Sequence, residues 1–120
     1  QTNVQDDVVQ DTKELEMEVL VEGEGTPAKE GDTVAVYYKG TFEDGTEFDS
    51  SDAHPPKTPF EFTLGEGMVI RGWDLGVEGM KPGETRKLVI PSDLAYGPND
   101  YNGIPGGSTL IFEVELLEVK

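Results

Sequence analysis

The chain contains no cysteine among its 120 residues. This absence excludes disulfides, thiol nucleophiles and thiolate-bound metals. Histidine is almost as scarce, because His54 is the only one and lies beside two prolines in a segment that we expect to be a solvated loop. We therefore expect neither a serine triad nor a histidine-rich metal site, and no metal or cofactor.

Positive charge is also scarce. Lysine and arginine number 9 against 25 aspartate and glutamate residues, which gives a formal net charge of −16. Proteins that bind nucleic acid need clustered cations, so nucleic acid is not an expected partner. No apolar run is long enough to cross a bilayer, and no membrane insertion is expected. We expect a soluble monomer, either cytoplasmic or exported after removal of a signal peptide.

The length fits a single domain. Residues 1–12 are polar and acidic without a clear period, and we expect them to form a flexible tail before a domain that spans residues 13–120. Within the domain, apolar residues alternate with polar ones in short runs, the pattern of half-buried strands. These runs predict strands over residues 15–22, 33–39, 47–49, 60–64, 85–90 and 109–119.

The first of these strands has a particularly regular pattern. Leu15, Met17, Val19 and Val21 alternate with glutamates. Glutamate is a poor strand former, so we expect burial of the apolar face to decide the structure.

One short segment has helical rather than alternating spacing. Ile70, Trp73 and Val77 are spaced for one helix face, but Gly72 and Gly76 each cost about 1 kcal/mol relative to alanine inside a helix. Such a helix forms only if a sheet packs on it. The predicted fold class is therefore α+β, with a five- to six-stranded antiparallel sheet wrapped around one short α-helix.

Turn signals separate the strands. Asp44-Gly45 lies between two strand-like runs and predicts a hairpin. Residues 81–84 have the Pro-Gly centre of a type II turn. The stretch 91–108 is a long loop rich in glycine and proline, and loops of that length in a compact domain are usually functional.

Aromatic residues are the strongest functional signal. A core of this size has little use for so many rings unless some of them line a cavity, with the 91–108 loop at its mouth. The rings in question belong to Tyr38, Phe48, Phe60, Trp73, Tyr96 and Phe112.

Four segments of the sequence, taken in order, resemble the FKBP-type peptidyl-prolyl isomerases. They are Phe48 to Ser51, Val69 to Trp73, Ala95 to Gly97 and Thr109 to Leu116, and the similarity extends from about Leu15 to Val119. The resemblance implies isomerisation of X-Pro bonds in peptides and unfolded proteins. It also implies that proline-containing polypeptides, and macrolides such as tacrolimus or rapamycin, are partners.

The resemblance also implies a set of site residues. Trp73 would form the floor beneath the proline ring, while the Ile70 backbone N–H and the Tyr96 hydroxyl would hold the carbonyls of the ligand. Asp49 would either orient the pocket by its charge or accept a hydrogen bond that ties Tyr38 to the sheet. The implied catalytic residues are Tyr38, Phe48, Asp49, Ile70, Trp73, Tyr96 and Phe112, and the implied substrate-binding residues are Phe60, Val69, Ile104 and Tyr101.

Two other functions remain open at this stage. A non-catalytic binding module would keep the fold and use the groove or the acidic surface to hold a partner. A chaperone that holds unfolded chains is the other, although the short connection from Tyr96 to Thr109 leaves no room for an apolar flap.

Overall fold

The structure is a computed structural model, and it describes residues 15–51, 58–101 and 103–120. The predicted tail over residues 1–12 and the single histidine lie outside the described residues. The strands are β1 (Glu16–Val21), β2 (Thr33–Phe42), β3 (Glu47–Ser50), β4 (Phe60–Thr63), β5 (Thr85–Ile90) and β6 (Leu110–Val119). The helices are α1 (Arg71–Val77) and the short 3₁₀ helix η3 (Ser92–Leu94), which lies in the long loop.

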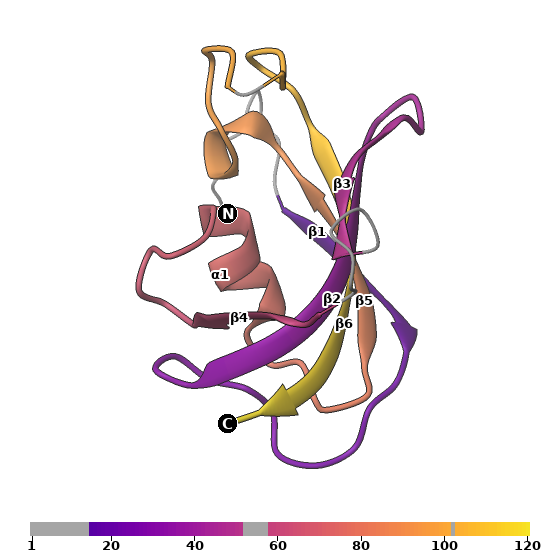
Figure 1. Ribbon diagram of the computed structural model, residues 1–120, viewed down its shortest axis with the longest axis vertical. Coiled ribbons are helices and arrows are strands. Elements are labelled where there is room, and N and C mark those ends of the chain that lie inside the picture. Colours follow the sequence, from indigo (N-terminus) through magenta and orange to yellow (C-terminus); the bar gives the residue numbers. More distant parts are fainter. Residues whose placement is uncertain (1–14, 52–57, 102) are drawn as a thin grey trace, which may run out of the picture.

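The strands form one antiparallel sheet in the order β1-β5-β6-β2-β3. Strand β4 also pairs with β2, so β3 and β4 share one edge of β2, with β3 opposite residues 39–41 and β4 opposite residues 33–36. The sheet curves around α1, which lies on its concave side (Figure 1). The predicted α+β fold with a six-stranded antiparallel sheet around one short helix is therefore confirmed.

The core lies between the concave face of the sheet and α1. The predicted apolar face of β6 is confirmed, because Leu110, Phe112, Val114 and Leu116 are all buried. Val34 and Val36 of β2 face the same core. Because side chains alternate along a strand, the residues between these buried ones point to the convex face of the sheet.

The two glycines of α1 allow the helix to lie close to β5. A Cβ atom on Gly72 would lie 2.4 Å from Cγ2 of Ile90, and one on Gly76 would lie 2.7 Å from Cδ2 of Leu88. Close packing on the sheet therefore requires the residues that weaken the isolated helix. Packing on the sheet also explains why a seven-residue helix forms although it contains two glycines.

The prediction for β1 was wrong in one respect. The strand is present, but all six of its residues are exposed, including Met17, Val19 and Val21, which were expected to be buried. A seven-residue helix is only about 10 Å long. It packs against β5 and leaves the edge strand beyond it uncovered. Of the predicted apolar face, Leu15 alone packs against the core.

The predicted turns are present. The 42–46 hairpin is closed by hydrogen bonds from Phe42 N to Thr46 O and from Gly45 N to Phe42 O, both 2.9 Å long. In the 81–84 turn, Glu84 N donates to Lys81 O at 2.9 Å, and Gly83 has the positive φ of 88° that a type II turn requires. Among the described residues, no helix is long and apolar enough to cross a membrane.

Candidate active site

A cavity of about 280 Å³ lies between α1 and the sheet. This volume is close to the lower end of the roughly 300–1,000 Å³ that is typical of ligand clefts. Strands β2, β3, β4 and β6, the segment before α1, the helix itself and the 91–108 loop all contribute to it. The lining residues are Tyr38, Phe48, Asp49, Phe60, Met68, Val69, Ile70, Trp73, Tyr96 and Phe112.

Trp73 lies at the base of this cavity, with 5% of its surface exposed. Three rings stand roughly perpendicular to the indole: Tyr38 at a centroid distance of 5.3 Å, Phe60 at 6.0 Å and Phe112 at 5.2 Å. Perpendicular contacts of this kind are favourable and hold the rings in place. The indole Nε1 is buried and has no hydrogen-bond partner among the described residues.

Two hydrogen-bond donors of the cavity are left available. Ile70 is the N-cap residue of α1, and its carbonyl accepts from Trp73 N at 2.9 Å. Its own N–H, however, donates to no other described residue. The Tyr96 hydroxyl likewise has no hydrogen-bond partner in the described parts of the chain, although its ring stacks on another tyrosine. Within the part of the chain that the structure describes, the cavity therefore combines aromatic walls with two donors that have no partner.

Asp49 fixes the polar side of the cavity. Its carboxylate accepts a hydrogen bond from the Tyr38 hydroxyl at 2.9 Å and another from Ser50 N at 2.8 Å. Burial, followed by this hydrogen bond and the charge of Asp49, raises the pKa of Tyr38 to about 12. Burial, together with Tyr101 and Asp49, also raises the pKa of Tyr96. Both hydroxyls therefore remain protonated donors at neutral pH.

The segment that leads into α1 is held by a residue that the sequence analysis did not single out. The Asp74 carboxylate accepts hydrogen bonds from Gly65 N at 3.0 Å and from Gly67 N at 3.2 Å. Met68, Val69 and Ile70 follow directly, and all three line the cavity. The contribution of Met68 was also missed. An aspartate in the first turn of a helix after two nearby glycines is the signal that could have indicated this anchor.

The other end of α1 is held from β5. The Arg86 guanidinium donates to the carbonyls of Gly76 at 2.9 Å and Glu78 at 3.2 Å, which are the orphan acceptors at the end of the helix. It also forms an ion pair with Glu84 at 2.8 Å, and both side chains are largely buried. No local pattern in the sequence could have predicted this contact, because it joins a strand to a helix eight to ten residues away.

Nine of the eleven predicted site residues lie together in the lining of the cavity, and the other two lie beside it. Tyr101 stacks on Tyr96 with a centroid distance of 4.6 Å and nearly parallel rings, and it is half exposed. Ile104 is buried in the core cluster and forms an isolated β-bridge with Tyr101. These two residues support the loop that carries Tyr96 and do not line the cavity.

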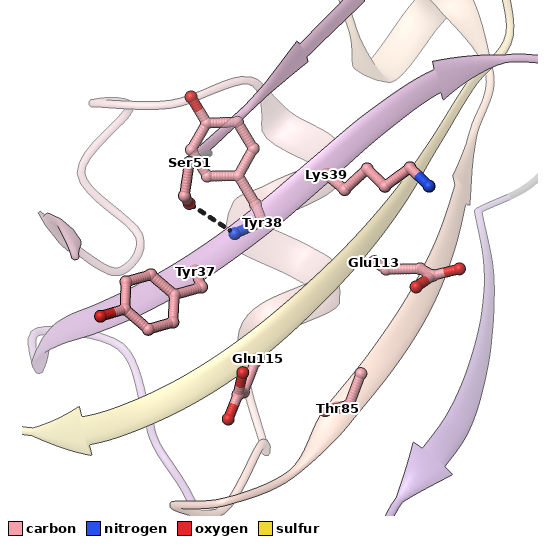
Figure 2. A pocket seen from close by; sticks show the side chains of 7 residues that line it. All are labelled: Tyr37, Tyr38, Lys39, Ser51, Thr85, Glu113 and Glu115. Carbon is pink, nitrogen blue, oxygen red and sulfur yellow. Dashed lines mark hydrogen bonds between the residues drawn. The ribbon is translucent and has the colours of Figure 1, made fainter. Parts of the chain in front are cut away.

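A second hollow, of about 170 Å³, lies on the convex face of the sheet. Figure 2 shows its lining, in which Lys39, Glu113 and Glu115 stand on neighbouring strands and the Ser51 hydroxyl accepts a hydrogen bond from Tyr38 N. The hollow is open and has charged walls. Its lining has only two rings, those of Tyr37 and Tyr38, and it is less enclosed than the first cavity, which is therefore the better candidate for an apolar ligand.

Comparisons with known proteins agree with the fold. The sequence pattern of the "FKBP-type peptidyl-prolyl cis-trans isomerase" family matches residues 24–117. Mouse peptidyl-prolyl cis-trans isomerase FKBP2 is 55% identical over 94 residues, which is 78% of this chain and 66% of the relative. FK506-binding protein 1A of Neurospora crassa is 50% identical over 108 residues, 88% of each chain. The crystal structure of AtFKBP13 superimposes with a TM-score of 0.80 at 36% identity, covering 88% of this chain and 93% of that one.

Proposed function

Because the chain belongs to the FKBP-type peptidyl-prolyl cis-trans isomerase family, we propose that it accelerates rotation about X-Pro bonds in peptides and unfolded proteins. The chain spans 66% of the length of mouse FKBP2, and the proposal concerns the domain described above. The observation that carries it is the cavity itself, a ring-lined hollow over a buried tryptophan with two free donors at its walls.

Such a cavity needs no nucleophile to act on an X-Pro bond. Amide resonance sets the rotational barrier at about 18–20 kcal/mol, and uncatalysed isomerisation takes tens to hundreds of seconds. The planar amide is polar, whereas the twisted amide has lost resonance and much of its charge separation. A dry aromatic cavity disfavours the planar form more than the twisted one, which is differential binding of the transition state.

We assign the roles as follows. The Trp73 indole supports the proline ring, with Tyr38, Phe60 and Phe112 around it. The Ile70 N–H and the Tyr96 hydroxyl hold the flanking carbonyls while the imide turns. Asp49 accepts the hydrogen bond of the Tyr38 hydroxyl and adds negative charge to one wall of the cavity. It can therefore serve both as a structural acceptor and as a charge that orients the pocket.

The same cavity is proposed to bind macrolides such as tacrolimus and rapamycin. Several relatives, including those from Neurospora crassa and Aspergillus oryzae, are named FK506-binding proteins. A macrolide that occupies the cavity would compete with proline-containing peptides. We therefore expect tacrolimus to inhibit the isomerase activity.

The test is a proline-limited refolding assay with wild-type protein and two matched variants. Tyr96→Phe keeps the ring but removes the proposed donor, and we expect a loss of roughly 0.5–1.5 kcal/mol of transition-state binding, about two- to tenfold in kcat/KM. Tyr37→Phe makes the same change on the convex face, where Figure 2 places this ring, and should leave the rate unchanged.

If the wild-type protein binds proline peptides without shortening the slow phase, the chain is a binding module. If it suppresses aggregation without either effect, the chaperone interpretation replaces the proposal.

A further inference from the structure

Strand β1 forms one edge of the sheet, in indigo in Figure 1. It pairs with β5 on one side, and among the described residues no strand pairs with its other side. The backbone N–H and C=O groups along that side are therefore available to an added strand. This edge is separated from the candidate active site by β5 and β6.

Apolar side chains are unusually exposed along this edge. Met17 is 53% exposed, Val19 47% and Val21 54%. Met17 and Val19 lie opposite Leu88 and Arg86 in the register with β5, so they point to the concave face, beyond the cover of α1. An apolar strip on a free strand edge is typical of sites where extended peptides add to a sheet.

Acidic side chains occupy two of the three alternate positions of β1, with the exposed Leu20 at the third, and two more follow the strand. Glu16 and Glu18 point to the convex face, and Glu22 and Glu24 follow the strand. All four are exposed, and none forms an ion pair with another described residue. Over Glu16–Val19 the edge therefore presents apolar side chains on one face and negative ones on the other.

We infer that the β1 edge binds an extended segment of a partner polypeptide in which apolar residues alternate with lysine or arginine. In an added antiparallel strand, successive side chains point to opposite faces. The apolar residues of such a segment would lie beside Met17 and Val19, while its basic residues would lie beside Glu16 and Glu18. This inference is independent of the isomerase proposal, because it requires neither proline nor the cavity.

The charge pattern disfavours a second copy of this chain as the occupant. Pairing of two β1 strands would bring glutamate rows together on a protein whose net charge is −16, and like charges at a strand interface are destabilising. The register shift between Val19 and Val21 limits the regular part of the edge to Glu16–Val19, so the segment that it accepts is short.

The test uses a synthetic seven-residue peptide that alternates lysine and valine, with a glutamate–valine peptide of the same length as the charge control. Neither contains proline, so neither probes the isomerase site. We expect the lysine peptide to shift the β1 amide resonances in NMR titrations and to slow hydrogen exchange of the outward-facing β1 amides. Its affinity should fall as salt is raised. The glutamate peptide should cause none of these changes.

Paired charge reversals localise the effect. Glu16→Lys/Glu18→Lys should raise the Kd of the lysine peptide at least about tenfold, the change expected when two attractive contacts become repulsive. Glu43→Lys/Glu47→Lys makes the same change in net charge at the opposite edge and should alter the Kd less than about twofold, because only long-range screened charge is affected.

Four results would overturn the inference: no binding at millimolar peptide, equal binding of both peptides, shifts centred on the cavity, or a concentration-dependent dimer of the wild-type chain that the charge reversal abolishes.

Discussion

Two apolar regions of this molecule differ in what covers them. Around Trp73, rings from four strands, the helix and a loop enclose a hollow, and the indole is 5% exposed. Along β1, side chains of similar hydrophobicity are about half exposed on a free edge. Cover by α1 makes the difference, because the seven-residue helix packs against β5 and leaves β1 uncovered. Enclosure is suited to chemistry that needs a dry site, whereas an open edge is suited to association.

The largest effect is expected at the floor of the cavity. Trp73→Ala should lower the free energy of unfolding by about 3–5 kcal/mol, because it removes a buried ring that four others contact. It should also lower kcat/KM at least about tenfold. Leu75→Ala on the exposed side of the same helix is the control and should change stability by less than about 0.5 kcal/mol. Equal effects of the two substitutions on kcat/KM would show that Trp73 is not part of the site.

A matched methionine pair compares the two regions directly. Met80 is fully buried in the core, whereas Met17 is 53% exposed on β1. Met80→Ala should cost about 2–5 kcal/mol, because it leaves a cavity behind. Met17→Ala should cost less than about 0.5 kcal/mol. Urea denaturation measures both, and a large loss in Met17→Ala would show that the β1 edge is covered after all.

The close approach of α1 to the sheet is tested by one added methyl group. Gly72→Ala would place a Cβ atom 2.4 Å from Ile90, and we expect a destabilisation of about 1–3 kcal/mol from overpacking. In the background of Ile90→Ala the same change should cost less, since the clashing atoms are gone. A double-mutant cycle gives this coupling, and strict additivity would contradict the contact.

The smallest effect concerns the pH dependence of Tyr38. Its pKa is raised to about 12 by burial, by the Asp49 hydrogen bond and by the Asp49 charge. Because the folded pKa exceeds the ordinary value of 10.0, the stabilisation is fully present below pH 10 and is lost as the pH rises through about 12. Asp49→Asn should lower the Tyr38 pKa toward, but not to, the ordinary value. Carbon NMR of the tyrosine ring measures this shift, and an unchanged pKa would mean that burial acts alone.

Local patterns in the sequence predicted much of the fold and the cavity. Alternation located the strands, and the spacing of Ile70, Trp73 and Val77 located α1, because these patterns depend on neighbours along the chain. The Asp74 anchor had a local signal that was overlooked, but the Arg86 contact was missed because it joins segments that only the folded chain brings together. The error at β1 has the same origin, since alternation predicts a strand but does not tell which of its faces another element covers.

Fluorescence offers the most direct measurement, because Trp73 is the only tryptophan in the chain. Tacrolimus should be titrated while Trp73 emission and the rate of a proline-limited refolding reaction are followed in parallel. Since the indole forms the floor of the cavity, we predict that emission changes and isomerase activity falls with the same midpoint. Inhibition without any change in Trp73 emission, or no acceleration of refolding before tacrolimus is added, would contradict the assignment of this cavity as the isomerase site.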